Sequence, residues 1–160
     1  MTIKKYLLQQ LAAIGDLTEK HPAHSFSVLI LVYCGMDQFS WLNTAKEKHG
    51  FPEFKEWVEK YVFLHHQLNC NAEELWAARN AVVHMGTTES LNNRNGVQKL
   101  GYSYGPNVQQ ALVADHKIVS IELLVQAFIE GAMFFIADLE ADASKLAAAE
   151  EKINKLLFVK

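Results

Sequence analysis

The chain has 160 residues, half of them hydrophobic and 21% charged, with a formal net charge of −3. This length fits one domain, and the composition supplies enough apolar material for a globular core. A general nucleic-acid-binding protein is usually clearly basic, so the net charge argues against that class but leaves room for a local positive site. We therefore expect one helical domain over residues 1–160.

Apolar residues at helical spacing predict a first helix over 3–19, which ends before His21-Pro22 because the residue before a proline is disfavoured in a helix. Glutamines interrupt this stretch, so we expect a helix and not a signal peptide. The apolar stretches at 26–36 and 123–137 are too short or too polar to span a bilayer, which takes about 20 apolar residues. The sequence therefore predicts a soluble, cytoplasmic protein with no membrane span.

Two further helices are predicted before the middle of the chain. A long apolar segment over 23–48 predicts a central helix, which Gly50 closes. Pro52 then lies in the first turn of a short helix with the sequence "PEFKEWVEKYVFLHH". A proline is well tolerated there because the first N–H groups of a helix have no partner within it.

The fourth predicted helix, over 72–85, has the clearest boundaries. Asn71 is a good N-cap, and Glu74 follows three residues later in the capping-box pattern. Gly86 is a natural stop, since glycine is the usual residue just past a helix end. Local sequence alone therefore predicts where this helix begins and ends.

An arginine lies in the apolar seam of this fourth helix. Successive helical residues are rotated by about 100°, which places large apolar residues on both sides of Arg79. An unpaired buried guanidinium costs roughly several kcal/mol, so this side chain needs a partner or a ligand. Asp37 in the central helix or Glu130 in a later helix can supply a structural ion pair. The flanking apolar residues are Leu75, Trp76, Val82 and Val83.

Directly after the fourth predicted helix the sequence no longer has helical periodicity. Short apolar and aromatic runs around the sequence GPN (105–107) predict a small irregular hairpin near 97–114. Ser120 is then expected to cap a long apolar helix over 121–141, and an amphipathic helix follows over 143–157. The predicted fold is an all-α, up-and-down bundle of five or six helices.

The segment "NAEELWAARNAVVHMG" resembles the signature of the HEPN superfamily, small helical-bundle domains in which one helix reads R-N-x-x-x-H. Arg79, Asn80 and His84 occupy the three motif positions. The pair Leu75-Trp76 is similar to the leucine–aromatic pair often found before the motif. The motif match covers residues 79–84, whereas the resemblance in helix arrangement covers nearly the whole chain.

This resemblance implies a site and two classes of function. Many HEPN domains are metal-independent endoribonucleases in which two motifs face each other across a homodimer. Others only bind RNA, nucleotides or proteins. In the nuclease case His84 would move the proton of the ribose 2′-OH or of the leaving oxygen, Arg79 would stabilise the phosphoryl oxygens, and Asn80 would orient the imidazole or contact the phosphate. Some nuclease members carry tyrosine two positions after the histidine, where this chain has Gly86.

Three functions therefore stay open at this point. The leading expectation is an endoribonuclease of the toxin or defence type, acting as a homodimer. The first alternative is a noncatalytic module that binds RNA, a nucleotide or an antitoxin-like protein partner. The second is a structural dimer in which Arg79 pairs with Asp37 and nothing binds.

Residues outside the motif supply weaker candidates. Arg94 and Lys99 can contact phosphate from a loop near the motif helix, and Tyr102 can stack on a base. The alternative for Tyr102 is packing of the hairpin against the helices. His65-His66 and Cys70 lack a second ligand pair at zinc-type spacing, so neither a metal nor another cofactor is expected.

Overall fold

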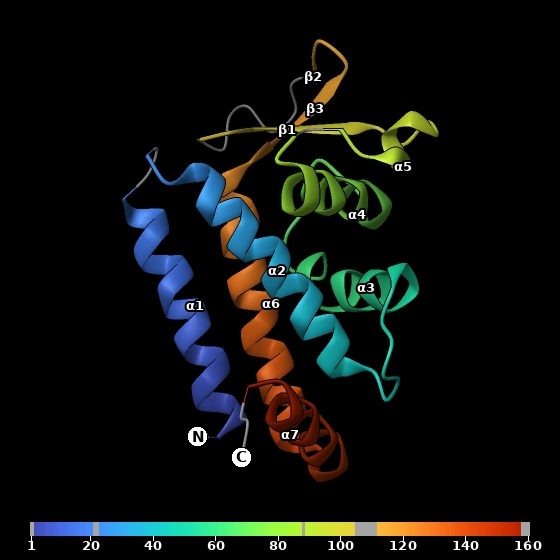
Figure 1. Ribbon diagram of the computed structural model, residues 1–160. Coiled ribbons are helices and arrows are strands. Elements are labelled where there is room, and N and C mark those ends of the chain that lie inside the picture. Colours follow the sequence, from blue (N-terminus) through green and yellow to red (C-terminus); the bar gives the residue numbers. More distant parts are fainter. Residues whose placement is uncertain (1, 21–22, 88, 105–111, 158–160) are drawn as a thin grey trace.

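The computed structural model describes residues 2–20, 23–87, 89–104 and 112–157. The elements in chain order are α1 (Ile3–Glu19), α2 (Ser25–Asn43), α3 (Phe51–Trp57), the π-helical turn η1 (Val58–Val62), α4 (Ala72–Asn80), the π-helical turn η2 (Ala81–Met85), α5 (Leu91–Arg94), β1 (Lys99–Ser103), β2 (Leu112–Val113), β3 (His116–Ser120), α6 (Ile121–Ala141) and α7 (Ala143–Leu157). The helices α1, α2 and α6 run along the molecule, with α3 and α4 on one side of α2 (Figure 1). The sheet lies at one end of these helices and α7 at the other.

Local capping signals placed several helices correctly. The predictions for α1, α6 and α7 are confirmed at both ends. The hydroxyl of Ser120 accepts a hydrogen bond of 3.3 Å from the backbone N–H of Leu123, as an N-cap should. At α4, Asn71 Oδ1 accepts from the N–H of Glu74, and the Glu74 carboxylate accepts from the N–H of Asn71, both at 2.9 Å. The predicted capping box is therefore confirmed.

The prediction of a mainly helical fold is confirmed, whereas the number of helices and the arrangement of the strands differ from the prediction. The described residues form seven α-helices, two π-helical turns and a three-stranded sheet in the order β1-β3-β2. The sequence predicted β structure in this region but not the parallel pairing of β1 with β3, because that pairing joins strands that are distant along the chain. The prediction also missed α5, a single turn that Ser90 and Asn93 close through their backbone and side chains.

The predicted hairpin near 97–114 is wrong. Strand β1 pairs in parallel with β3, with Lys99 opposite His116 and Ser103 opposite Ser120. The antiparallel pairing joins β2 to β3 across a turn at Ala114, which has a positive φ of 48°. A tight hairpin turn joins only antiparallel strands, so the parallel strands β1 and β3 cannot be the two arms of a hairpin. The GPN sequence on which the hairpin prediction depended lies outside the described residues.

The predicted end of the central helix is also wrong. Helix α2 stops at Asn43, and Gly50 is instead the N-cap of α3, where its N–H donates to Glu53 at 3.0 Å. A residue far along the chain ends α2: the ammonium group of Lys152 in α7 donates to the carbonyl oxygens of Trp41, at 2.6 Å, and Thr44. Local sequence carries no sign of this contact.

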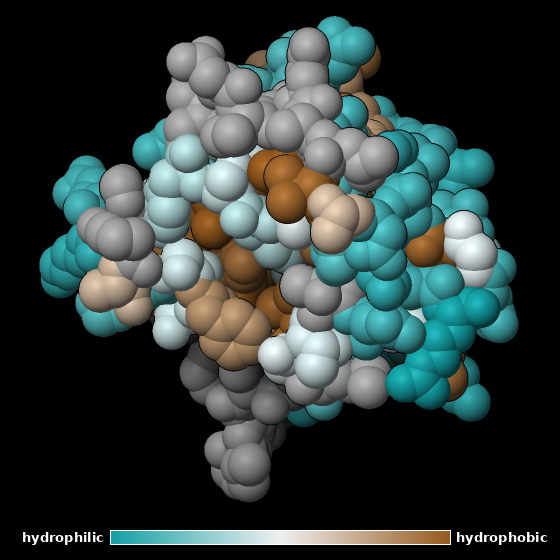
Figure 2. Space-filling view, turned by 90° about the horizontal axis from the view of Figure 1, so that it is seen from above, coloured by the Kyte–Doolittle hydropathy of each residue, from teal (hydrophilic) through white to brown (hydrophobic). Residues whose placement is uncertain are grey.

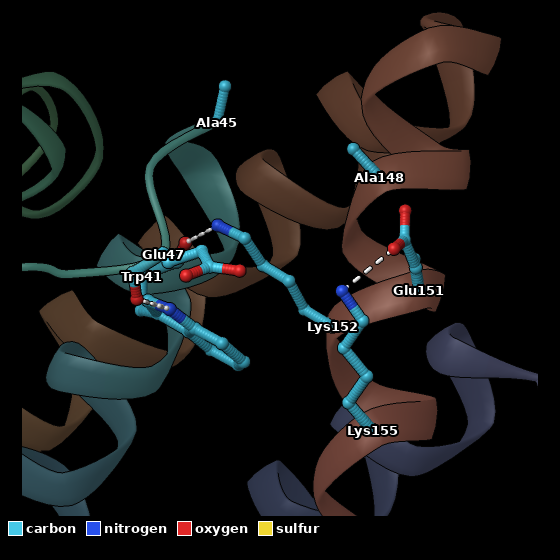
Figure 3. Close-up of a pocket in the computed structure, with 7 residues that line it drawn as sticks. All are labelled: Trp41, Ala45, Glu47, Ala148, Glu151, Lys152 and Lys155. Atoms are coloured by element: carbon cyan, nitrogen blue, oxygen red, sulfur yellow. Dashed lines mark hydrogen bonds and ion pairs between the residues drawn. The ribbon is translucent and has the colours of Figure 1, made fainter.

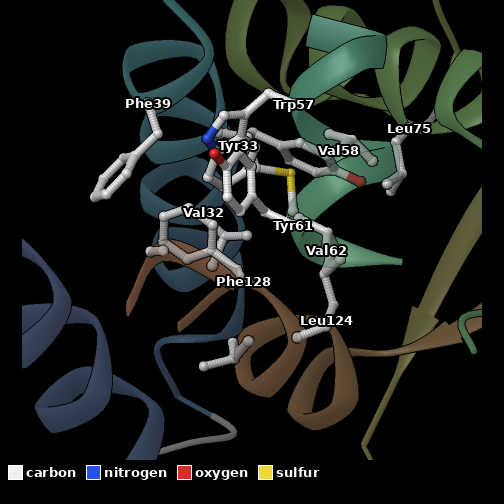
Figure 4. Close-up of a cluster of buried hydrophobic side chains, with 14 of the residues drawn as sticks. Val32, Tyr33, Phe39, Trp57, Val58, Tyr61, Val62, Leu75, Leu124 and Phe128 are labelled. Atoms are coloured by element: carbon white, nitrogen blue, oxygen red, sulfur yellow. The ribbon is translucent and has the colours of Figure 1, made fainter. Parts of the chain in front are cut away.

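Aromatic side chains join α2, α3 and α6 at the centre of the core (Figure 4). The buried ring of Phe39 has its centre 5.6 Å from that of Phe128, 5.7 Å from that of Phe135 and 5.8 Å from that of Trp57. All three neighbouring rings lie edge-on or tilted to Phe39, the arrangement that aromatic quadrupoles favour. This packing fixes α2 as the central helix against which the remaining helices are placed.

The surface of the end that carries the sheet is mixed. Hydrophobic side chains gather in a hollow near the middle of this face, and hydrophilic side chains cover the side on which α5 lies (Figure 2). Among the described helices, α2 alone is long and apolar enough to cross a membrane, with a mean hydropathy of 1.2 over its most apolar window. Half of that window is buried inside the fold.

We predict that Gly131→Ala lowers the free energy of unfolding by about 1–3 kcal/mol, a typical cost of overpacking. A Cβ at this position would lie 2.6 Å from the carbonyl oxygen of Tyr61 in η1 and 2.8 Å from its carbonyl carbon. Both atoms belong to the backbone, so α6 and η1 would have to move apart. Urea denaturation measures the effect.

Gly15→Ala in α1 is the matched control, because nothing lies within 4 Å of a Cβ built there. Removing a glycine from a helix interior stabilises by about 0.5–1 kcal/mol, so this variant should gain stability. Equal stability of the two variants would contradict the close approach of α6 and η1.

Candidate functional site

The motif helix changes from α to π geometry within the motif itself. Helix α4 ends at Asn80 and η2 continues to Met85, so His84 lies on the π turn. In a continuous α-helix, residues five apart point about 140° away from each other. A π turn closes with an i→i+5 hydrogen bond, which brings such residues closer together, and single π turns often occur at functional sites. The sequence predicted a helix here but not this change.

Arg79, Asn80, His84 and Asp37 form one hydrogen-bonded group, which we call the Arg79 cluster. The Nε and Nη2 groups of Arg79 both donate to Asp37 Oδ2 on α2. Its Nη1 donates to Asn80 Oδ1 at 2.8 Å and to His84 Nε2 at 2.7 Å. The structure therefore joins the three motif residues through one guanidinium and ties them to the central helix.

The contact between Arg79 and His84 defines how the histidine is arranged. A guanidinium only donates hydrogen bonds, so the Nε2 atom that faces it must be unprotonated. The imidazole of His84 is exposed, whereas the side chains of Arg79 and Asp37 each keep 17% of their surface exposed. The cluster thus presents a neutral imidazole to solvent in front of a mostly buried ion pair.

Burial dominates the electrostatics of the groups behind His84. Burial raises the pKa of Asp37, and the guanidinium of Arg79 opposes this by stabilising the carboxylate. His49, in the loop after α2, is also affected by burial, which lowers its pKa. The nearby carboxylate of Asp37 acts in the other direction and raises that pKa. Asp37 Oδ1 is buried and has no hydrogen-bond partner among the described residues. The ion pair therefore stands in a weakly solvated place where charge interactions are strong.

His49 reaches the cluster from behind. Its Nε2 lies 2.7 Å from the hydroxyl of Ser40, and that hydroxyl donates to the carbonyl oxygen of Asp37 at 3.0 Å. Because the one hydroxyl proton of Ser40 is used in this way, Nε2 of His49 must carry the proton and donate. Ser40 is completely buried, and its hydroxyl connects His49 to the backbone of α2.

Gly86 lies at the position where some HEPN nucleases carry tyrosine. It ends η2 in the left-handed conformation, with φ 62° and ψ 29°, and its N–H bonds to the carbonyl oxygens of Ala81 and Val82. A tyrosine at this position would be strained, because residues with a Cβ rarely adopt a positive φ. The glycine at position 86 is therefore required by the way in which the motif helix ends.

The other predicted binding residues lie outside the Arg79 cluster. Arg94 pairs with Glu89 at 3.4 Å, and Lys99 bridges Glu89 and Asp115 at 3.1 and 3.0 Å. The hydroxyl of Tyr102 lies 2.6 Å from that of the fully buried Tyr33. In the described part of the chain, none of the three predicted residues hydrogen-bonds to the cluster.

The remaining titratable candidates also have other partners. Glu130, the second candidate partner of Arg79, instead lies 2.8 Å from Nε2 of His66. The ring of His65 stacks on Phe134 with 4.4 Å between their centres. Across the described ranges, no three His, Cys, Asp or Glu side chains are grouped so that they could hold a metal ion.

A cavity of about 380 Å³ lies between the end of α2 and α7, away from the motif (Figure 3). Lys152 and Trp41 line it, and the ammonium nitrogen lies 4.9 Å from the centre of the indole ring. Two of the polar side chains here have partners, since Lys152 bonds to backbone carbonyls and Lys155 pairs with Glu151 at 2.8 Å. This cavity shares no lining residue with the Arg79 cluster.

Aromatic residues beside the cluster were missed by sequence reasoning. Arg79 Cζ lies 5.2 Å from the centre of the Trp76 ring. The rings of His49 and Phe51 lie around that indole, and both come from a segment more than 20 positions before the motif. Neither residue belongs to a recognisable pattern, so only the packing of α3 against α4 could reveal them.

Comparison of the chain with protein-family models, with curated proteins and with solved structures found no match. The resemblance to HEPN domains thus depends on the short motif alone. The function must be argued from the chemistry of the Arg79 cluster.

Proposed function

We propose that this protein is a metal-independent endoribonuclease of the HEPN type that cuts single-stranded RNA as a homodimer. One observation carries the proposal: Nη1 of Arg79 lies 2.7 Å from Nε2 of the exposed His84. A phosphate that displaces this contact would meet a cation and a base at the same point of the surface. These are the two groups that transfer of the phosphoryl group to the ribose 2′ oxygen requires.

The reaction needs one proton acceptor and one proton donor. His84 of one protomer removes the proton of the 2′-OH, whose oxygen forms a bond to the adjacent phosphorus. The bond from phosphorus to the 5′ oxygen breaks, and this oxygen takes a proton from the protonated His84 of the second protomer. Arg79 stabilises the negative charge that builds up on the non-bridging oxygens. The products are a 2′,3′-cyclic phosphate and a free 5′-OH.

A second copy of the chain would supply the second guanidinium and the second imidazole that the reaction needs. Within one chain Asp37 balances the charge of Arg79, and one histidine cannot be acid and base at once. Two clusters facing each other provide two guanidinium groups and two imidazoles. For the setting we propose the cytoplasm and a toxin- or defence-type system, in keeping with the family that the motif resembles.

A noncatalytic module that binds RNA, a nucleotide or an antitoxin-like protein partner is the second candidate. The pairing of Arg79 with Asp37 favours it, because a neutralised guanidinium attracts phosphate weakly. The net charge of −3 acts in the same direction. Both candidates use the same surface and differ in whether His84 moves a proton.

The first prediction for this function is that the wild-type protein cuts a mixed single-stranded RNA in excess EDTA and that His84→Ala is at least about 100-fold slower. The reason is that general acid–base catalysis depends on the imidazole and not on a metal. Gel analysis of end-labelled RNA, with identification of the cyclic-phosphate ends, measures the rate and the reaction type.

His65→Ala is the matched control, since it removes an exposed histidine outside the cluster and should cut like the wild type. Absence of cutting by wild-type protein whose dimer is verified by light scattering would rule out the nuclease for these substrates. Retained binding in that case would identify the noncatalytic module.

The second prediction is that Asp37→Asn tightens RNA binding but slows cutting by up to about 100-fold. Loss of the carboxylate frees the charge of Arg79 and also removes the group that holds its guanidinium beside His84. The slope of log affinity against log salt should steepen by about 0.7, the value for one more phosphate contact on a single strand.

Asp138→Asn serves as the control for net charge. It also removes one negative charge, but from a carboxylate that pairs with Lys60 at 2.8 Å, outside the Arg79 cluster. Binding is measured by fluorescence anisotropy with a 2′-O-methyl RNA that cannot be cut. Identical salt slopes for the two variants would refute a role of Asp37 in restraining Arg79.

A further inference from the structure

An aromatic group adjoins the Arg79 cluster. The Trp76 ring lies under the guanidinium, with its centre 5.2 Å from Cζ. The ring of Phe54 lies 5.1 Å from it, that of Phe51 6.1 Å and that of His49 6.2 Å, measured between centres. Phe54 is fully buried, whereas Trp76, Phe51 and His49 are each only partly buried. Three rings thus reach the surface next to the one motif arginine.

The polar edge of Trp76 also remains available. Its indole N–H has no acceptor among the described residues and, unlike that of Trp57, is not one of the buried unpaired groups. The equivalent N–H of Trp41 donates to the carbonyl oxygen of Glu47 at 3.1 Å. Trp76 therefore combines an apolar ring with an N–H for which no described residue supplies an acceptor, as in side chains that contact ligands.

His49 adds an acceptor to this group. Its Nε2 donates to Ser40, which leaves Nδ1 as the unprotonated nitrogen. Burial lowers the pKa of His49, in keeping with a neutral ring at neutral pH. Unprotonated imidazole nitrogen can accept a hydrogen bond from an exocyclic amino group of a base.

We propose that Trp76, Phe51 and His49 form a subsite for a nucleobase of the RNA whose phosphate binds at Arg79. This inference rests on the proposed function and adds the means by which the strand is held. In RNA each base is attached to the same sugar as a phosphate. When that phosphate binds at Arg79, the base is therefore close enough to reach the ring of Trp76, which lies against the guanidinium. Aromatic rings and guanidinium planes stack on bases of unpaired strands, with little dependence on sequence.

The experiment compares two probes that cannot be cut: a 2′-O-methyl oligoadenylate of six nucleotides and the same backbone without bases. Wild-type protein should bind the base-bearing probe about tenfold more tightly, within the range measured for one stacked base. Trp76→Leu should remove this preference, and Trp76→Phe should keep most of it. Trp41→Leu, at the cavity between α2 and α7, should behave like the wild type.

The folded state of each variant is checked by thermal melting. If Trp76→Leu does not fold, tryptophan fluorescence replaces it as the test. The base-bearing probe should then quench a part of the wild-type emission that is absent from Trp76→Phe.

The outcomes separate the subsite from the proposed function. Equal binding of both probes, lost in Arg79→Ala, overturns the subsite and leaves the phosphate site in place. A preference for bases that survives in Trp76→Leu overturns the subsite as well. Failure to bind either probe, together with absence of RNA cutting, overturns both proposals.

Discussion

The ion pair between Arg79 and Asp37 is the constraint on which the candidate site depends. It joins the motif helix to α2, the helix whose ring at Phe39 lies at the centre of the aromatic core. Both charges are mostly removed from water, and breaking such a pair strands one of them at a cost of about 3–5 kcal/mol for fully buried pairs. The pair therefore fixes the guanidinium in one orientation, and only that orientation places Nη1 against both Asn80 and His84.

The π turn follows from the same constraint. An α-helix that placed Arg79 over Asp37 would carry His84 round to another face. The wider turn of η2 brings the imidazole back to the guanidinium, and Gly86 ends the helix immediately afterwards in a conformation that other residues avoid. The second π turn, η1, accommodates a different contact, the close approach of its backbone to Gly131. Both π turns of the described chain thus lie at close tertiary or side-chain contacts.

The parts of the fold that sequence predicts are those set by neighbouring residues. Asn71 with Glu74 and Ser120 with Leu123 close hydrogen bonds within one turn, so the starts of α4 and α6 could be read directly. The end of α2 depends on Lys152, more than 100 positions away, and the pairing of β1 with β3 depends on a crossover. Local patterns carry no information about such contacts. The site divides in the same way: the motif spacing identified Arg79 and His84, whereas His49 and Phe51 reach it only through the packing of α3 against α4.

The charge of the cluster constrains how an RNA could be held. Asp37 already balances Arg79, and the chain as a whole carries a net charge of −3, so attraction of phosphate alone would give weak and salt-sensitive binding. Stacking on a ring does not depend on net charge. Trp76 is a partly buried ring, and its centre lies 5.2 Å from Cζ of the guanidinium that would bind the phosphate. Affinity in this protein would then come mainly from the bases, while Arg79 and His84 would act on the phosphate as its charge increases in the transition state.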